Sequence, residues 1–178
     1  MPVVNGSPLS RAVMSTSDST AAEFTFDAPT IADTVRLGQV LAEVLPAGSL
    51  VALDGTLGAG KTRLVQAVAE ALGVNPRDVV SPTFVLAQQY DARRTIHHVD
   101  VYRLKDEDEF LELGVEESLA GSGLVFIEWA GRIASSLPNE RLQIAISVTG
   151  PESRQFCMTA LGDKYAEAVG KLRELLGR

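Results

Sequence analysis

From about residue 23 onward, short apolar runs alternate with stretches in which apolar residues recur every three or four positions. Runs with the length and alternation of strands are 23–26, 50–53, 84–90, 95–100, 124–127, 142–148 and 154–160. Stretches with helical periodicity are 30–45, 63–72, 106–114, 115–120 and 163–176, with a small helical piece near 133–137. Strands interleaved with helices predict an α/β fold. The pattern contains no internal repeat and no second domain.

Two links between strand-like runs are too short to contain a helix. Asp91-Ala92-Arg93-Arg94 joins 84–90 to 95–100, and the turn-forming Gly150-Pro151-Glu152 lies between 142–148 and 154–160. Links of this kind form hairpins, in which the two strands are antiparallel. We therefore predict a mixed sheet with parallel and antiparallel strands, and 23–26 is a candidate edge strand.

The spacing of apolar residues predicts which side of two helices is buried. Thr30 is expected to cap the helix 30–45, whose inward-facing residues are predicted to be Ile31, Val35, Leu41, Val44 and Leu45. The last helix is predicted to bury Val169, Leu172, Leu175 and Leu176. Pro82 prevents a helix through 81–84, so an extended run is expected to start at Phe84.

Composition narrows the class of protein. The chain has 178 residues, 46% hydrophobic and 22% charged, as is typical of one globular domain. Its net charge of −7 argues against a broad nucleic-acid-binding surface. Cys157 is the only cysteine, which excludes an internal disulfide and suits a cytoplasmic protein. No apolar run approaches the length of a membrane span. Residues 1–22 are predicted to be a disordered tail, and 23–178 the folded domain.

One segment fits a phosphate-binding motif. Gly55-Thr56-Leu57-Gly58-Ala59-Gly60-Lys61-Thr62 matches G-x-x-x-x-G-K-[ST] without mismatch, between the run 50–53 and the helical stretch 63–72. The glycines let backbone N–H groups and the helix N-terminus surround an anion closely. Lys61, expected at the surface of the loop, would contact the outer phosphates, and the Thr62 hydroxyl would bind Mg²⁺. The motif predicts a nucleotide site formed by Gly55 through Arg63 in a single-domain, P-loop NTPase-like three-layer sandwich.

Two acids end strand-like runs that are expected to lie beside this site. Glu128 follows the unbroken apolar run 124–127, where P-loop proteins carry an acid that serves the metal. Asp100 ends the more polar run 95–100, and the strand period places His98, Asp100 and Tyr102 on one face. Both acids are candidates for catalysis, and the alternative for each is an acid that caps a turn.

Five further residues leave alternatives open. Thr83 is either a switch residue that senses a γ-phosphate or part of a simple turn. Arg103 would either neutralise phosphate or pair with the acids at 106–109. Trp129 would either stack on a base or belong to the core or an interface. His97 and His98 are not spaced as metal ligands, and we interpret them as structural, with contact to a partner protein as a further option.

The order of these segments resembles one family. After the phosphate loop come Ser81-Pro82-Thr83-Phe84, His98-Val99-Asp100-Val101-Tyr102-Arg103-Leu104, Glu112-Leu113-Gly114 and Glu128-Trp129. This order closely resembles the bacterial TsaE (YjeE) family of small P-loop ATPases over residues 25–161. The loop motif is shared by many families, whereas the two segments that follow it are specific. Thr56 departs from the family, which usually has Asp at that position.

The resemblance implies an activity, cofactors and partners. TsaE proteins support the formation of threonylcarbamoyladenosine next to the tRNA anticodon, together with the TsaD and TsaB proteins. ATP and Mg²⁺ would be the cofactors. Lys61 and Thr62 would hold phosphates and magnesium, Glu128 would serve the metal or the attacking water, and Asp100 and Thr83 would belong to the active site or switch. Hydrolysis is expected to be weak alone and activated by partners, and tRNA would be met only through the assembly.

Other functions of a P-loop protein are weaker matches. A small-molecule kinase usually carries a mobile lid with arginines, and the 91–94 segment is short for a lid. A GTPase would carry an Asn-Lys-x-Asp segment, which the sequence lacks. A binding module that uses nucleotide only as a structural switch is the third option.

Overall fold

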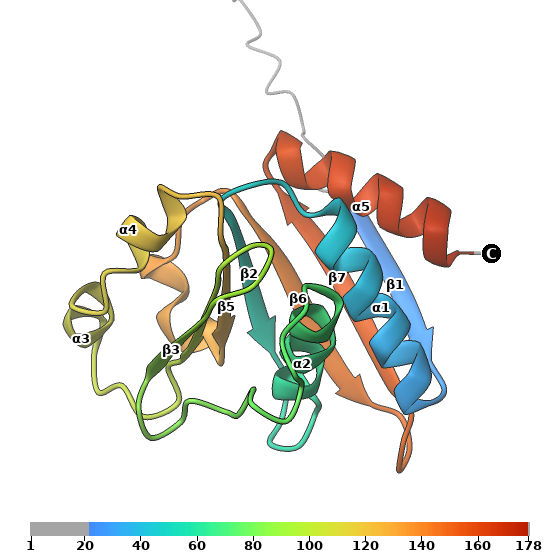
Figure 1. Cartoon of the computed structure of the whole chain (residues 1–178), viewed down its shortest axis with the longest axis horizontal. Helices are drawn as coiled ribbons and strands as arrows, with labels where there is room; N and C mark the ends of the chain where they lie inside the picture. The colour runs from blue at the N-terminus through green and yellow to red at the C-terminus, as the bar shows by residue number, and fades with distance from the viewer. Residues whose placement is uncertain (1–21, 178) are drawn as a thin grey trace, which may run out of the picture.

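A seven-stranded sheet with the order β1-β7-β6-β2-β5-β4-β3 forms the centre of the computed structural model, which describes residues 22–177 (Figure 1). The strands are β1 (Glu23–Ala28), β2 (Ser49–Asp54), β3 (Ala87–Tyr90), β4 (Ile96–Asp100), β5 (Leu124–Glu128), β6 (Arg141–Val148) and β7 (Arg154–Leu161). Strands β4, β5, β2 and β6 pair in parallel, whereas β3–β4, β6–β7 and β7–β1 pair antiparallel. The predicted mixed sheet, with both hairpins and an edge position for β1, is confirmed. The predicted disordered tail lies, except for Ala22, outside the described residues.

Helices cover both faces of this sheet. They are α1 (Ile31–Val44), α2 (Lys61–Ala71), α3 (Glu107–Leu111), α4 (Val115–Leu119), the 3₁₀ segment η1 (Ala130–Ser136) and α5 (Asp163–Leu176). One buried cluster joins α1, α2 and α5 to the sheet, and a second joins α3, α4 and η1 to its other face. The predicted three-layer sandwich is therefore confirmed. None of the helices within residues 22–177 is long and apolar enough to cross a membrane.

The inner positions of β2 and β5, 50–53 and 124–127, are apolar because both faces of these strands are covered. In β2, Val51 and Leu53 belong to the first cluster, and Leu50 and Ala52 belong to the second. Parallel strands end at the same edge of a sheet, so the carboxyl ends of β2, β5 and β4 lie together. Asp100 pairs with Glu128 in the register of β4 and β5. This edge receives the phosphate loop that follows β2.

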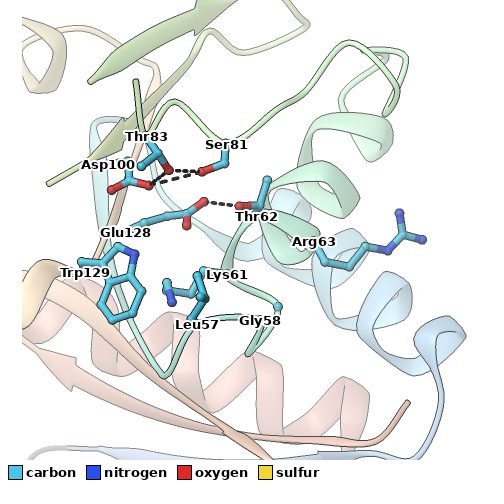
Figure 2. A pocket seen from close by; sticks show the side chains of 11 residues that line it. Leu57, Gly58, Lys61, Thr62, Arg63, Ser81, Thr83, Asp100, Glu128 and Trp129 are labelled. Atoms are coloured by element: carbon cyan, nitrogen blue, oxygen red, sulfur yellow. Dashed lines mark hydrogen bonds between the residues drawn. The ribbon is translucent and has the colours of Figure 1, made fainter. Parts of the chain in front are cut away.

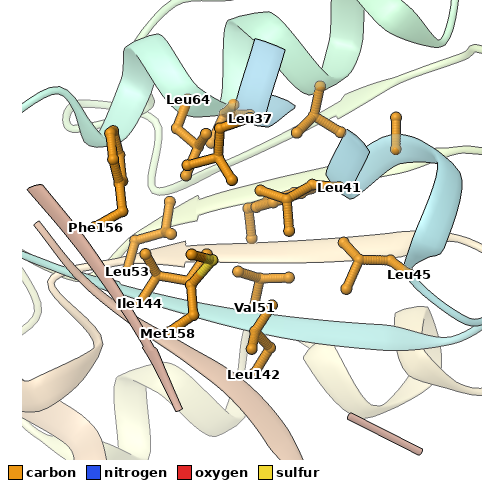
Figure 3. Close-up of a cluster of buried hydrophobic side chains, with 14 of the residues drawn as sticks. Leu37, Leu41, Leu45, Val51, Leu53, Leu64, Leu142, Ile144, Phe156 and Met158 are labelled. Atoms are coloured by element: carbon orange, nitrogen blue, oxygen red, sulfur yellow. The ribbon is translucent and has the colours of Figure 1, made fainter. Parts of the chain in front are cut away.

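Helix α1 begins where the sequence predicts. The Thr30 hydroxyl accepts a hydrogen bond from the backbone N–H of Asp33, whose carboxylate accepts one from the backbone N–H of Thr30. Two such bonds satisfy backbone donors that would otherwise have no partner at the helix start. Figure 3 shows Leu37 and Leu41 from this helix packed toward the side chains of Val51 and Leu53.

The predicted buried face of α1 is partly wrong. Leu41 and Leu45 are buried and Val35 and Val44 half-buried, but Ile31 is 46% exposed. The residues of α1 that are buried are Thr34, Leu37, Gly38, Leu41 and Ala42. A Cβ added at Gly38 would lie 2.4 Å from the Cβ of Ala67 in α2. A small residue thus lets the two helices pack closely. Ile31 lies on the same side of α1 as Gly38, seven residues earlier, and is exposed at the first position of the helix, beside a cavity that Arg63 also lines.

Two other local predictions need correction. Leu175 was predicted to face inward but is 44% exposed, because the buried stripe of α5 runs through Tyr165, Ala168, Val169, Leu172 and Leu176. The extended run expected from Phe84 begins only at Ala87. The backbone N–H groups of Val85 and Leu86 both donate to the Pro82 carbonyl, at 3.0 and 2.7 Å. Residues 82–86 therefore form a turn that leaves Phe84 82% exposed.

Candidate functional site

The phosphate loop connects β2 to α2 at the carboxyl edge of the sheet. Gly58 and Gly60 have φ angles of 76° and 108°, which side chains other than glycine rarely adopt. Gly60 is the N-cap of α2, and no side chain caps this helix start. The free N–H groups of the first turn are thus left for a ligand, which is the arrangement that binds phosphate at helix N-termini.

Lys61 is more buried than the sequence predicts. Only 4% of it is exposed, so the expectation of a lysine at the loop surface is wrong. Its Nζ donates to the carbonyls of Gly55 and Thr56, at 2.8 and 3.0 Å, and lies 3.7 Å from the centre of the Trp129 ring. Burial lowers the pKa of Lys61, and nearby carboxylates, with Glu128 the strongest, partly offset that effect. The ammonium group is held inside the loop by the chain's own backbone.

Glu128, at the end of β5, contacts side chains from two other elements. Its Oε1 accepts a hydrogen bond of 2.7 Å from the Thr62 hydroxyl at the start of α2. The same oxygen lies 2.8 Å from Nε2 of His98 in β4. Glu128 and His98 are 3% and 0% exposed. Figure 2 shows the Glu128 carboxylate turned toward Thr62 across the cavity.

Asp100 holds the segment that contains Thr83. Its Oδ2 accepts hydrogen bonds from the hydroxyls of Thr83 and Ser81, at 2.6 and 3.2 Å (Figure 2). Its Oδ1 accepts one from the backbone N–H of Tyr102, at 2.8 Å. Asp100 thus faces the cavity and also fixes the turn around Thr83. Asp100 therefore fits both alternatives, since it lines the site and also caps a turn.

Trp129 borders the site in an unusual backbone conformation. Its φ of 63° is one of two positive values at non-glycine residues within 22–177. Its ring lies beside Lys61 and 4.8 Å from the ring of Tyr102. Two residues later, the backbone N–H of Gly131 donates to Asp54 at the end of β2, at 2.8 Å. Conformations of this kind cost energy and gather at functional sites, so Trp129 is part of the site's framework.

Most of the predicted site residues line one cavity of about 260 Å³. Its lining is Leu57, Gly58, Gly60, Lys61, Thr62, Arg63, Ser81, Thr83, Asp100, Glu128 and Trp129. Three predicted binding residues contribute differently: Gly55 and Thr56 accept from Lys61, and Ala59 is buried. Figure 2 shows the Arg63 side chain pointing away from Glu128 and Asp100. Arg63 also lines a second cavity of about 220 Å³, together with Gly58, Gly60 and Arg154.

Arg154 and His98 contact the site although neither was predicted to do so, as does Ser81, which lines the cavity beside Thr83. Arg154 of β7 donates from Nε to the Ala59 carbonyl, at 2.8 Å, and from Nη2 to the Gly58 carbonyl, at 3.3 Å. No local signal marks it, because it is 95 residues from Ala59. His98 was interpreted as structural with an option to face a partner, and its burial contradicts that option. The strand period did place it on the face of Asp100.

The remaining candidates lie away from the cavity. The Arg103 guanidinium lies 4.4 Å from the centre of the Phe84 ring, and Arg103 is not among the residues that line the cavity. Lys105 rather than Arg103 forms the ion pair with the acidic run, through Glu109 at 3.7 Å. His97 is half-buried and lines a separate hollow beside β3.

A central parallel strand, a glycine-rich loop, a helix and acids at the ends of neighbouring strands define the P-loop class of nucleotide-binding proteins. A family model described as "Threonylcarbamoyl adenosine biosynthesis protein TsaE" matches residues 28–156. The chain belongs to the TsaE family.

Named relatives and a solved structure agree with this assignment. The chain is 40% identical over 134 residues to the "tRNA threonylcarbamoyladenosine biosynthesis protein TsaE" of Bacillus subtilis, which covers 75% of this chain and 83% of the relative. It is 41% identical over 123 residues to the protein of the same name from Treponema pallidum, covering 69% and 90%. A crystal structure of Bacillus subtilis YdiB superposes with a TM-score of 0.72 at 30% identity, covering 86% of this chain and 96% of YdiB.

Proposed function

We propose that this protein binds ATP with Mg²⁺ beside the phosphate loop and hydrolyses it in support of tRNA threonylcarbamoyladenosine biosynthesis. The observation that carries the proposal is the hydrogen bond between Thr62 and Glu128, which joins the loop hydroxyl to the acid of β5. The names of the relatives supply the pathway. Hydrolysis is proposed on the basis of the acids, because binding alone needs only the loop.

Thr62 and Glu128 fit a magnesium ion that is bound partly by the protein and partly by the phosphates of a nucleotide. Within residues 22–177, no group of three or more His, Cys, Asp or Glu side chains is arranged to hold a metal by itself. Magnesium commonly takes one or two carboxylates and completes its shell with phosphate oxygens and water. Thr62 and Glu128 are the residues that would hold it. The bound ion would neutralise negative charge on the phosphoryl oxygens.

The loop residues would receive the phosphates, and the second cavity would receive the nucleoside. Free N–H groups after Gly60 would bind phosphate oxygens, and Lys61 would exchange its contacts to Gly55 and Thr56 for the outer phosphates. The adjoining cavity shares Gly58 and Gly60 with the first, so a ligand that extends along the loop would enter it.

Activation by TsaD and TsaB is the second part of the proposal. Transition-state charge in phosphoryl transfer is often neutralised by an arginine, in some cases from another protein. Within the described residues, Arg63 is the one arginine that lines the cavity, and it points away from the two acids. The Thr83 hydroxyl donates a hydrogen bond to Asp100, so its contact with a γ-phosphate would require a rearrangement of residues 81–84. A partner would supply both the charge and the rearrangement.

The surface around the cavity is suited to a protein partner. Leu57, which lines the cavity, and Phe84 and Val85 in the turn at 82–86 are 87%, 82% and 65% exposed. Exposed apolar patches commonly mark interaction sites. The sequence predicts docking near Thr83, His97 and Trp129, and because His97 lines a separate hollow, we propose that partners dock around Thr83 and Trp129. The net charge of −7 supports contact with tRNA mainly through those partners.

Phosphate release from the purified protein tests the proposal, measured alone, with TsaD and TsaB titrated in, and with small-molecule acceptors. We expect slow release alone and an increase of about 10³–10⁵-fold on partner addition, the range seen when a group is supplied in trans. A high rate that ignores the partners would contradict partner activation. Transfer of phosphate to an added acceptor would favour a kinase, and nucleotide binding without turnover under all conditions would favour a non-catalytic switch.

A further inference from the structure

His98 has a buried contact that the phosphate-loop motif does not explain. It lies in β4, is 0% exposed, and its Nε2 is 2.8 Å from Oε1 of Glu128 on the neighbouring strand β5. In the register of these strands, Asp100 is opposite Glu128 and His98 is opposite Phe126. Alternate residues share a face of a sheet, so His98 reaches Glu128 diagonally from the same face as Asp100.

The partners of the two ring nitrogens indicate which one carries the proton. An ionised carboxylate only accepts hydrogen bonds, so Nε2 must donate to Glu128. Nδ1 is buried and has no hydrogen-bond partner among residues 22–177. A buried N–H without a partner is rarer in proteins than a buried acceptor without one. The geometry therefore points to Nε2 as the nitrogen that carries the proton.

This proton affects how Glu128 is oriented. Oε1 is held by two donors from different elements, the Thr62 hydroxyl of α2 and the imidazole of β4. With Oε1 fixed on both sides, the carboxylate cannot rotate freely, and Oε2 has no hydrogen-bond partner assigned within the described residues. Removal of a group that holds a metal-binding side chain in one orientation commonly lowers metal affinity or activity by about 10–100-fold.

We propose that His98 is a positioning residue for Glu128 and that its Nε2–H group sets the orientation in which this carboxylate serves magnesium or the attacking water. The inference rests on the proposed function, since it concerns the reaction of bound Mg²⁺-ATP. It assigns a role to the donor group of His98 beyond filling space in the core.

Matched variants separate a donor role from a packing role. In His98→Gln the amide nitrogen can take the place of Nε2, whereas the shorter side chain in His98→Asn leaves Glu128 without this donor. Turnover at saturating Mg²⁺-ATP and the Mg²⁺ concentration for half-maximal effect are measured in each. In His98→Asn we expect a loss of about 10–100-fold in turnover or in Mg²⁺ affinity, as for other groups that orient a ligand, and His98→Gln should restore most of it. His97→Gln, on the half-buried neighbour outside the cavity, should leave both quantities unchanged.

Outcomes that overturn the proposal are specific. Unchanged turnover and Mg²⁺ affinity in folded His98→Asn would do so, and so would equal losses in folded His98→Gln and His98→Asn. A readout that needs no nucleotide is the ¹⁵N NMR spectrum of the histidine rings in the ligand-free protein. We expect the His98 proton on Nε2, with a shifted signal in Glu128→Ala, and a proton on Nδ1 alone would overturn the assignment even if His98→Asn does not fold. Absence of phosphate release from the wild-type protein with partners would instead count against the proposed function.

Discussion

Thr62 and Glu128 are 66 residues apart in the chain and are joined by a hydrogen bond of 2.7 Å. The first lies at the start of the helix after the phosphate loop, and the second ends the strand beside β2. The phosphate-loop motif and an acid proposed to serve a metal thereby share one cavity. The contact defines the part of the molecule in which mutations should separate binding from hydrolysis.

The two acids of this cavity are expected to differ in their effects. Glu128→Ala should lower ATP turnover by about 10²–10⁴-fold, the range for a group acting in proton transfer or positioning, while nucleotide binding is kept. Asp100→Asn should lower turnover by a similar or smaller factor. Steady-state hydrolysis in the presence of TsaD and TsaB, with calorimetric titration of ATP, checks both. Glu174→Ala, at an exposed position of α5, is the control. Normal turnover in Glu128→Ala together with an inactive Asp100→Asn would show that the roles are reversed.

Lys61→Ala should remove most of the ATP affinity. Hydrogen bonds to charged groups contribute about 1.5–3 kcal/mol, so the dissociation constant should rise by roughly 10–100-fold. The fold should survive, because the carbonyls of Gly55 and Thr56 lie in the loop beside the cavity, where water can replace the ammonium. Calorimetric titration with Mg²⁺-ATP measures the affinity, and circular dichroism confirms the fold. Lys105→Ala, on a side chain that is 84% exposed, should bind as the wild type does. Wild-type affinity in folded Lys61→Ala would contradict the assignment of the loop.

The lowered pKa of Lys61 predicts a pH dependence of ATP binding. Burial lowers this pKa in the free protein, whereas bound phosphate would favour the charged ammonium. Binding should therefore take up a proton, and ATP affinity should fall as pH rises through the lowered pKa toward the ordinary lysine value of about 10.4. Between the lowered pKa and the ordinary one, Lys61 holds its proton more fully in the unfolded chain than in the free folded protein. The free energy of unfolding therefore rises with pH in this range.

Titration of ATP affinity against pH measures this effect. Lys61→Arg should give a flatter curve over the same range, because guanidinium keeps its proton there. The slopes are compared rather than the absolute affinities, since arginine fits the loop differently. Parallel curves for the wild type and Lys61→Arg would assign the pH dependence to another group.

Two helical glycines should respond in opposite directions to replacement by alanine. Gly38→Ala places a methyl group 2.4 Å from the Cβ of Ala67, so we expect a loss of about 1–3 kcal/mol in the free energy of unfolding. At Gly170 of α5 no atom lies within 4 Å of the new Cβ, so Gly170→Ala should gain about 0.4–1 kcal/mol. Thermal and urea unfolding of both variants are the measurements. Equal changes in the two would mean that the close packing of α1 on α2 has no energetic consequence.

The sequence by itself determined the parts of this protein that depend on neighbouring residues. The phosphate loop is recognisable because its glycines, lysine and threonine must follow one another at fixed spacing between a strand and a helix. The hairpins follow from link length, and the cap of α1 from Thr30. The order of motifs was sufficient to indicate the TsaE family, which the comparison with the family model confirms.

The tertiary structure alone decided which distant residues meet. Contacts of Glu128 with Thr62 and His98, and of Arg154 with the loop carbonyls, depend on the strand order, which local periodicity does not encode. The exposure of Ile31 was mispredicted because it depends on which elements cover the first turn of α1, whereas Gly38, on the same side of the helix, is covered by Ala67 of α2. Burial of Lys61 likewise arises from the loop folding back over its own lysine. Hydrophobic patterns specify which elements form, whereas side-chain contacts between elements are specified only once those elements have packed.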